Sequence, residues 1–115
     1  MSPREIQLWL ADILTAIDEI TRFTEGMTKE EFCENLSIIR AVMMDFVMIG
    51  EAVANIPAEV QSKHSDVPWR DMKRMRNKVA HAYFGVNLNI MWTTIQHDLP
   101  PLIPQLRAIL DNLEE

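Results

Sequence analysis

The sequence predicts an all-α protein, an antiparallel bundle of about five helices. Apolar residues recur at steps of three and four along most of the chain, which is the spacing of one helix face. No stretch shows the strict alternation that a half-buried strand requires, and no internal repeat is present. Capping signals and prolines mark where the helices begin. A length of 115 residues predicts a single domain over residues 1–115.

The first helix begins at Ser2-Pro3-Arg4-Glu5, which combines a capping box with proline at the first helical position. An apolar stripe follows, and Gly26 can adopt the left-handed conformation that ends the helix. The residues of the stripe are Ile6, Trp9, Leu10, Ile13, Ile17 and Ile20.

A second capping box, Thr28 to Glu31, opens a helix that we expect to run unbroken to Pro57. The short connection between the two helices predicts an antiparallel hairpin. We expect Met43, Met44 and Met48 to fill gaps in the core. The apolar side of this second helix is expected to hold Phe32, Leu36, Ile39, Met43, Phe46, Val47, Met48 and Val53.

After Pro57 we expect a short helical turn over residues 58–63 and a third main helix from near Pro68 to before Gly85. Asn87 can cap the next helix, and Pro100 with Pro101 must kink or restart the chain. Residues 102–113 form a last amphipathic segment. The inward side of the third main helix holds Trp69, Met72, Met75 and Val79, and we expect Trp9, Trp69 and Trp92 in the core.

Composition gives the protein's general class. Hydrophobic residues make up 48% and charged residues 24%, as in a soluble globular protein. The lone Cys33 cannot form an internal disulfide, no Cys/His pair has zinc-ligand spacing, and no apolar run is long enough to cross a membrane. We therefore expect a cytoplasmic protein without a metal or cofactor.

The charge is unevenly distributed. Residues 63–78 hold six of the eleven basic residues and two acids, a net +4, which leaves −10 on the rest of a chain whose net charge is −6. Such a segment can attract a polyanion or can be a solvated helix face. Lys73, Arg74 and Lys78 are candidate contacts for an RNA backbone.

This basic segment leads into Arg76-Asn77-Lys78-Val79-Ala80-His81-Ala82-Tyr83. At about 100° per residue, Asn77 and His81 are neighbours on one face, and Arg76 and Tyr83 share another. Arg76 and His81 point about 140° apart. For both to act on one phosphate, either the helix end must deviate or a second copy of the chain must supply part of the site.

These residue types suit RNA cleavage without a metal. A histidine can move protons when the 2′-hydroxyl attacks the adjacent phosphorus, and an arginine can hold the phosphate and stabilise its charge. Asn77 can orient His81 or donate to the phosphate, and Glu51 either supports Arg76 through a charge pair or only faces solvent. The other interpretation of the histidine is structural, with His81 donating to a carbonyl near a helix end.

The motif resembles that of the HepT-type branch of the HEPN ribonuclease toxins, in which arginine, a polar residue, three positions, histidine, one position and tyrosine follow in that order. The surroundings are similar in the same order: Gly50-Glu51-Ala52, Val67-Pro68-Trp69-Arg70, Met91-Trp92-Thr93-Thr94-Ile95 and Asp98-Leu99-Pro100. The resemblance covers most of the chain.

The resemblance implies a HEPN-like homodimer acting as a metal-independent endoribonuclease toxin, with its site in a cleft at the dimer interface. Arg76, Asn77 and His81 would be catalytic. The implied antitoxin is a small MntA-like nucleotidyltransferase that attaches AMP to the motif tyrosine, here Tyr83. The alternative function is a non-catalytic helical module that binds a nucleotidyltransferase or its substrate.

Overall fold

The computed structural model describes residues 1–81 and 86–114, with the backbone alone for Ala80, His81 and Glu114. These residues form seven α-helices and one π-helical segment, with no strand among them, so the all-α prediction is confirmed with more helices than expected. In chain order the elements are α1 (Pro3–Thr24), α2 (Lys29–Glu34), α3 (Leu36–Asn55), α4 (Ala58–Lys63), α5 (Trp69–His81), α6 (Leu88–Thr93), the π-helical η2 (Thr94–Asp98) and α7 (Leu102–Glu114).

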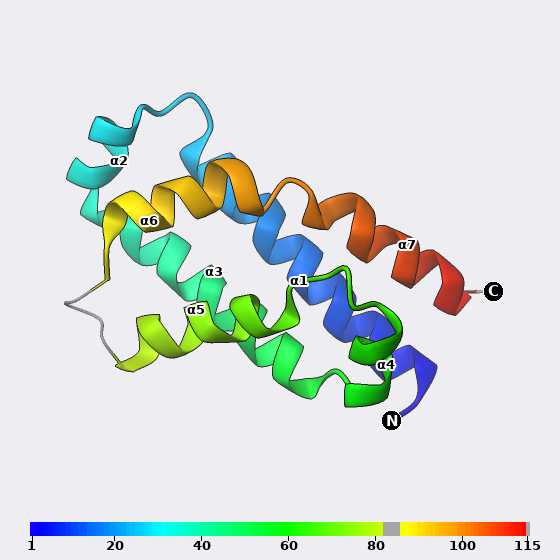
Figure 1. Cartoon of the computed structure of the whole chain (residues 1–115). Helices are drawn as coiled ribbons and strands as arrows, with labels where there is room; N and C mark the ends of the chain where they lie inside the picture. The colour runs from blue at the N-terminus through cyan, green and yellow to red at the C-terminus, as the bar shows by residue number, and fades with distance from the viewer. Residues whose placement is uncertain (82–85, 115) are drawn as a thin grey trace.

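The long helices lie side by side in the order α5, α3, α1, α7, and neighbours in this row run in opposite directions (Figure 1). The expected hairpin is therefore confirmed as the pair α1 and α3. The short helices α2 and α6 contact each other at the end of the row where α3 begins. Because α3 contacts both α1 and α5, it determines where α5 lies.

The helix starts follow the predicted caps. In α1 the Ser2 amide donates to Glu5 Oε2 at 3.3 Å, and the Glu5 amide donates to Ser2 Oγ at 3.2 Å. Thr28 and Glu31 form the equivalent pair at the start of α2. Gly26 has a φ of 76°, as its place after α1 predicts.

The prediction of one helix from Thr28 to Pro57 is wrong, because the chain breaks at Asn35. There the backbone is extended, with φ −101° and ψ 90°, and the Asn35 side chain accepts from the Ile38 amide at 3.1 Å. An asparagine side chain that caps the following helix competes with continuation of the preceding one. Asn35 therefore ends α2 and starts α3.

One hydrophobic core extends through the row of helices. Its fully buried side chains include Leu10, Ile13, Ile17 and Ile20 of α1, Val42 and Ile49 of α3, Met91 and Leu106. Trp69 is buried, whereas Trp9 and Trp92 are partly buried against the core. After Pro100 and Pro101 the chain restarts as α7.

Three residues placed in the core by periodicity are exposed instead. Leu36, Met44 and Met48 are 56%, 62% and 42% exposed. Leu36 is the first residue of α3, after the break, and does not share the stripe of Phe32. Met44 and Met48 lie one turn apart on α3, and Glu51 follows on the same stripe. The solvent-facing side of α3 is therefore apolar next to Glu51.

A carboxyl group lies buried between α1 and α3. Asp45 is 2% exposed, and among the described residues its Oδ2 has no hydrogen-bond partner. Burial raises the pKa of Asp45 from 3.8 to about 7, with a hydrogen bond to Glu19 of α1 and the charge of Glu19 acting in the same direction. The folded protein therefore keeps a proton on Asp45 that the unfolded chain loses near pH 4.

This proton makes stability fall as pH rises. Between pH 5 and pH 6 the folded state binds nearly one proton more at Asp45 than the unfolded state, and the excess falls to about half a proton at pH 7. The free energy of unfolding therefore drops by about 3 kcal/mol between pH 5 and pH 8. We expect Asp45→Asn to remove most of this slope in urea unfolding measured at several pH values. The exposed Asp12→Asn serves as control, and parallel profiles for wild type and Asp45→Asn would contradict the expectation.

Candidate functional site

Helix α5 carries the motif and is anchored at its start. Trp69 is buried, and its indole Nε1 donates to the His64 carbonyl at 3.0 Å. Met72 and Val79 are also buried, at 7% and 6% exposure, on the side that faces the core. The polar residues of α5 between them consequently lie toward its other sides.

Arg76 lies where α5 crosses α3, and Gly50 makes the crossing possible. A Cβ atom added at Gly50 would stand 2.0 Å from Arg76 Cβ and 2.5 Å from Arg76 Cγ. No side chain fits at such distances, so the absence of one at position 50 lets the two helices approach. The stem of Arg76 therefore runs directly over the backbone of α3.

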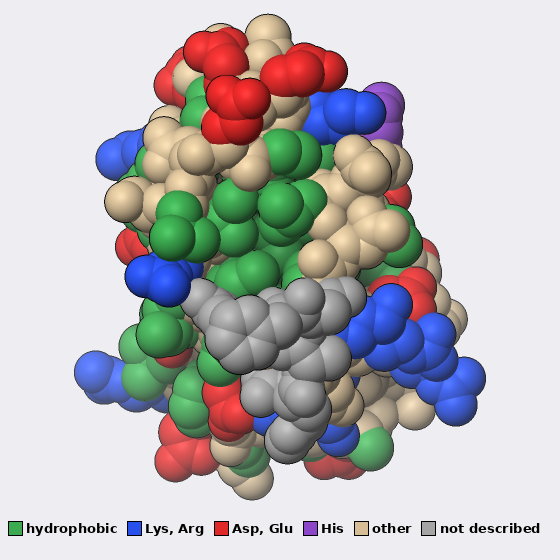
Figure 2. Space-filling view, turned by 90° about the vertical axis from the view of Figure 1, so that its left-hand side faces the viewer, with side chains coloured by type: hydrophobic (Ala, Val, Ile, Leu, Met, Phe, Trp, Pro, Cys, Tyr) green, Lys and Arg blue, Asp and Glu red, His purple; other side chains and the backbone are tan. Residues whose placement is uncertain are grey.

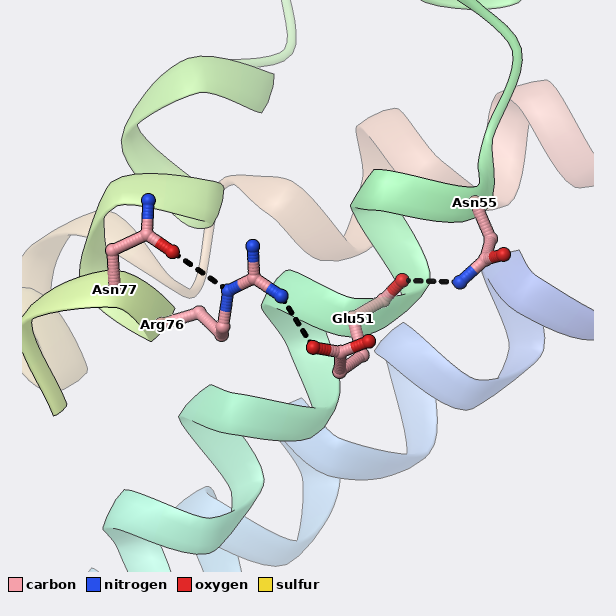
Figure 3. Close-up of polar contacts among 4 residues, drawn as sticks. All are labelled: Glu51, Asn55, Arg76 and Asn77. Carbon is pink, nitrogen blue, oxygen red and sulfur yellow. Dashed lines mark hydrogen bonds and ion pairs between the residues drawn. The ribbon is translucent and has the colours of Figure 1, made fainter. Parts of the chain in front are cut away.

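The guanidinium group of Arg76 is held by two neighbours (Figure 3). Its Nη1 forms an ion pair with Glu51 Oε1, and its Nε donates to Asn77 Oδ1 at 2.9 Å. The Glu51 backbone carbonyl accepts from Asn55 Nδ2 at 2.8 Å. The residues that the structure describes form no hydrogen bond or ion pair with Nη2, which leaves that group for a further acceptor.

Burial differs between the two partners of this ion pair. The Arg76 side chain is 19% exposed, whereas that of Glu51 is 55% exposed. Glu51 therefore forms the expected charge pair with the motif arginine while part of its side chain is exposed, and the alternative that it only faces solvent is wrong. A fixed, half-buried guanidinium loses little side-chain entropy when it binds a phosphate.

The candidate RNA contacts on α5 are exposed. Lys73, Arg74 and Lys78 all lie at the surface, and Arg74 makes only a loose contact with Asp71, at 3.9 Å from Nη1 to Oδ1. Figure 2 shows the end of the molecule at which α5 finishes, with basic side chains gathered at the right-hand edge of that face. The basic segment predicted from the sequence is thus accessible to a large anion.

The remaining motif residues are described in part or not at all. His81 is the last residue of α5, five positions after Arg76 and four after Asn77, and its side chain is outside the described part. Tyr83 lies outside the described residues altogether. The structure thus brings together Arg76, Asn77 and Glu51.

Reasoning from the sequence did not predict that Gly50 is the position where α5 packs against α3. A glycine inside a helical pattern lowers helix stability by about 1 kcal/mol, which signals a close approach of another element. That signal was present in Gly50-Glu51-Ala52. The sequence did not show which residue packs against Gly50.

Among the side chains that the structure describes, no three from His, Cys, Asp or Glu are grouped so that they could hold a metal ion. None of the helices described is both long and apolar enough to span a bilayer.

The helical bundle, with its motif arginine at the crossing of α3 and α5, is of the HEPN-like class. A family model described as "Ribonuclease HepT-like" matches residues 13–109, and the chain belongs to this HepT-like ribonuclease family.

Two relatives illustrate the similarity. "Probable ribonuclease HepT" of Thermococcus cleftensis is 42% identical over 94 residues, covering 82% of this chain and 86% of its own. "Putative RNase MJ0125" of Methanocaldococcus jannaschii is 37% identical over 115 residues, covering 100% of this chain and 99% of its own. No solved structure gives a significant match to this chain. The resemblance seen in the motif is therefore a family relationship.

Proposed function

We propose that this protein is a metal-independent endoribonuclease that acts as the toxin of a toxin-antitoxin pair in the cytoplasm. The observation that carries the proposal is the guanidinium of Arg76, fixed by Glu51 and Asn77 five residues before a histidine on the same helix. Membership of the HepT-like ribonuclease family supports RNA as the substrate.

The reaction needs only groups that the chain carries. The RNA 2′-hydroxyl loses its proton to a base as its oxygen attacks phosphorus, and the bond to the 5′-oxygen breaks as that oxygen gains a proton. His81 is the group that moves these protons, since imidazole titrates near neutral pH. Arg76 binds the phosphate and stabilises the charge on its oxygens. Lys73, Arg74 and Lys78 hold neighbouring phosphates.

A homodimer completes this site. The Arg76 side chain is directed onto α3, and the helix register puts His81 about 140° away from it around α5. Two copies meeting along α5 would bring the arginine of one to the histidine of the other. The exposed Met44 and Met48, on the stripe of α3 that leads to Glu51, give this contact an apolar surface beside the site.

The test is RNA cleavage by the purified chain in the presence of a chelator. We expect cleavage of a labelled single-stranded RNA to continue in excess EDTA, because no step requires a metal. Cleavage that stops with EDTA and returns with Mg²⁺ would overturn metal independence. A tight complex with a nucleotidyltransferase and no cleavage under any condition would favour the non-catalytic binding module.

The antitoxin in this proposal is an MntA-like nucleotidyltransferase that attaches AMP to Tyr83. An AMP group near Arg76 would occupy the place of an RNA phosphate by its charge and its bulk. After co-expression with such an enzyme and ATP, we expect the intact mass to rise by AMP increments and cleavage to fall. Tyr83→Phe should show neither change, and an equal mass increase in that variant would place the modification elsewhere.

A further inference from the structure

A stripe of polar residues runs along α5 from its start to position 81. Its members are Arg70, Arg74, Asn77 and His81. Because they follow one another at steps of four, three and four residues, the helix register places all of them on one side of α5. At about 1.5 Å per residue, the stripe is about 16 Å long. Arg70 and Arg74 are exposed, so a strand that reaches position 81 along this side of α5 passes both guanidinium groups.

Arg70 also lines an open groove of about 460 Å³. Helix α4 and the loop after it form the other wall of this groove, and they lie at the end of the row where α5 begins (Figure 1). Val67 and Trp69 close its base, since both are buried. The volume is in the range of small-molecule sites, so the groove has room for one nucleotide.

The groove presents a positive charge and hydrogen-bond donors. Among the described residues that line it, Arg70 alone is charged. The described part of the chain offers the Arg70 guanidinium no ion pair and no hydrogen bond. Ser62 and Ser65 line the same groove, are exposed, and carry hydroxyl donors. Phosphate oxygens accept from such donors, and the planar fork of an arginine matches the geometry of a phosphate.

We propose that this groove binds one nucleotide of the RNA strand, a few nucleotides away from the bond that is cleaved. Arg70 pairs with the phosphate of this nucleotide, and Ser62 and Ser65 donate to its oxygens. The strand then follows Arg74 to position 81. Because these contacts are made to the phosphate and not to base edges, the groove binds RNA of any sequence. This inference deepens the proposed function and rests on RNA being its substrate.

The probe is a single RNA strand of about 12 nucleotides in which every 2′-hydroxyl is methylated, so that the attacking group of the proposed reaction is blocked. The indole N–H signals in NMR report where the strand binds. Trp69 lines the groove, whereas Trp9 lies on α1, which α3 separates from α5. We expect a saturable shift of the Trp69 signal with that of Trp9 unmoved. Binding of the strand without a shift at Trp69, or no binding at all, would overturn the proposal.

Two variants separate a subsite from general attraction between charges. Arg70 is exposed, so Arg70→Ala keeps the fold, and we expect it to weaken binding of the methylated strand about fivefold. It should also lower the slope of log affinity against log salt concentration by about 0.7. Arg107→Ala removes the same charge from an exposed position on α7, outside the groove, and should have little effect on either quantity.

The outcomes also distinguish this inference from the proposed function. Equal weakening by Arg70→Ala and Arg107→Ala would show attraction to the overall charge only, and would overturn the subsite. Binding that depends on Arg70, together with unmethylated RNA that the wild-type protein leaves uncut, would remove the ribonuclease activity while the groove remains an RNA-binding site.

Discussion

Replacing either His81 or Arg76 with alanine is expected to lower the rate of RNA cleavage by about a thousandfold or more. In the proposed reaction, His81→Ala removes the proton carrier and Arg76→Ala removes the charge that would hold the phosphate. Neither change should unfold the protein, which circular dichroism and gel filtration can check. His64→Ala is the matched control, since it removes a histidine from the end of α4 and should leave cleavage unchanged. Undiminished cleavage by both motif variants would remove the catalytic assignment.

Mixing the two inactive variants tests whether the site is shared. If Arg76 of one protomer acts with His81 of its partner, a mixed dimer has one complete site and one that lacks both groups. After unfolding and refolding together, an equal mixture should regain about a quarter of wild-type activity. A site built within each protomer would regain none, because every protomer lacks one of the two groups.

Gly50→Ala is expected to damage both the fold and the site. The added Cβ would collide with Arg76 Cβ and Cγ, so α5 must move away from α3. Overpacking of this kind costs about 1–3 kcal/mol, more than the gain of up to about 1 kcal/mol from replacing glycine by alanine in a helix. Because the guanidinium shifts with α5, cleavage should fall about a hundredfold, as misplacement by an ångström can do.

Two further variants identify the cause. In Gly26→Ala the backbone is strained because its φ is positive, but the added Cβ would have no atom within 4 Å. This variant should therefore lower stability without affecting cleavage. In an Arg76→Gly background the collision partner is absent, so adding Gly50→Ala should cost much less in urea unfolding than it does in wild type. An equal cost in both backgrounds would mean that the close approach of Gly50 and Arg76 is not the reason.

Local signals predicted much of the fold. The caps at Ser2, Thr28 and Asn87 start α1, α2 and α6. They could be predicted because each cap depends only on atoms within three residues in the chain. The break at Asn35 was missed because apolar residues continue at helical spacing from Phe32 through Ile39 on both sides of it. Periodicity shows only which side of a helix is apolar. A single capping side chain that divides two helices leaves the spacing of the apolar residues almost unchanged.

The motif could be read directly from the sequence, but the contacts of its residues could not. The polar residues of the motif are adjacent in the chain, so their types and order could be read directly. The pairing of Glu51 with Arg76 joins residues 25 positions apart, and two interpretations of Glu51 stayed open until α3 and α5 were placed together. The exposure of Met44 and Met48 likewise depends on which sides of α3 are covered by α1 and α5.

The ion pair between Glu51 and Arg76 also bears on how ionic strength affects RNA binding. The charge of Arg76 is already paired with Glu51 before any phosphate arrives, so the local net charge of the two side chains is near zero. Such a paired cation attracts a polyanion weakly, whereas each contact of an unpaired lysine such as Lys73 or Lys78 with a single strand would release about 0.7 of an ion. The salt dependence of affinity should therefore be determined by the exposed basic residues, and Arg76 should contribute selectivity for phosphate geometry at any ionic strength.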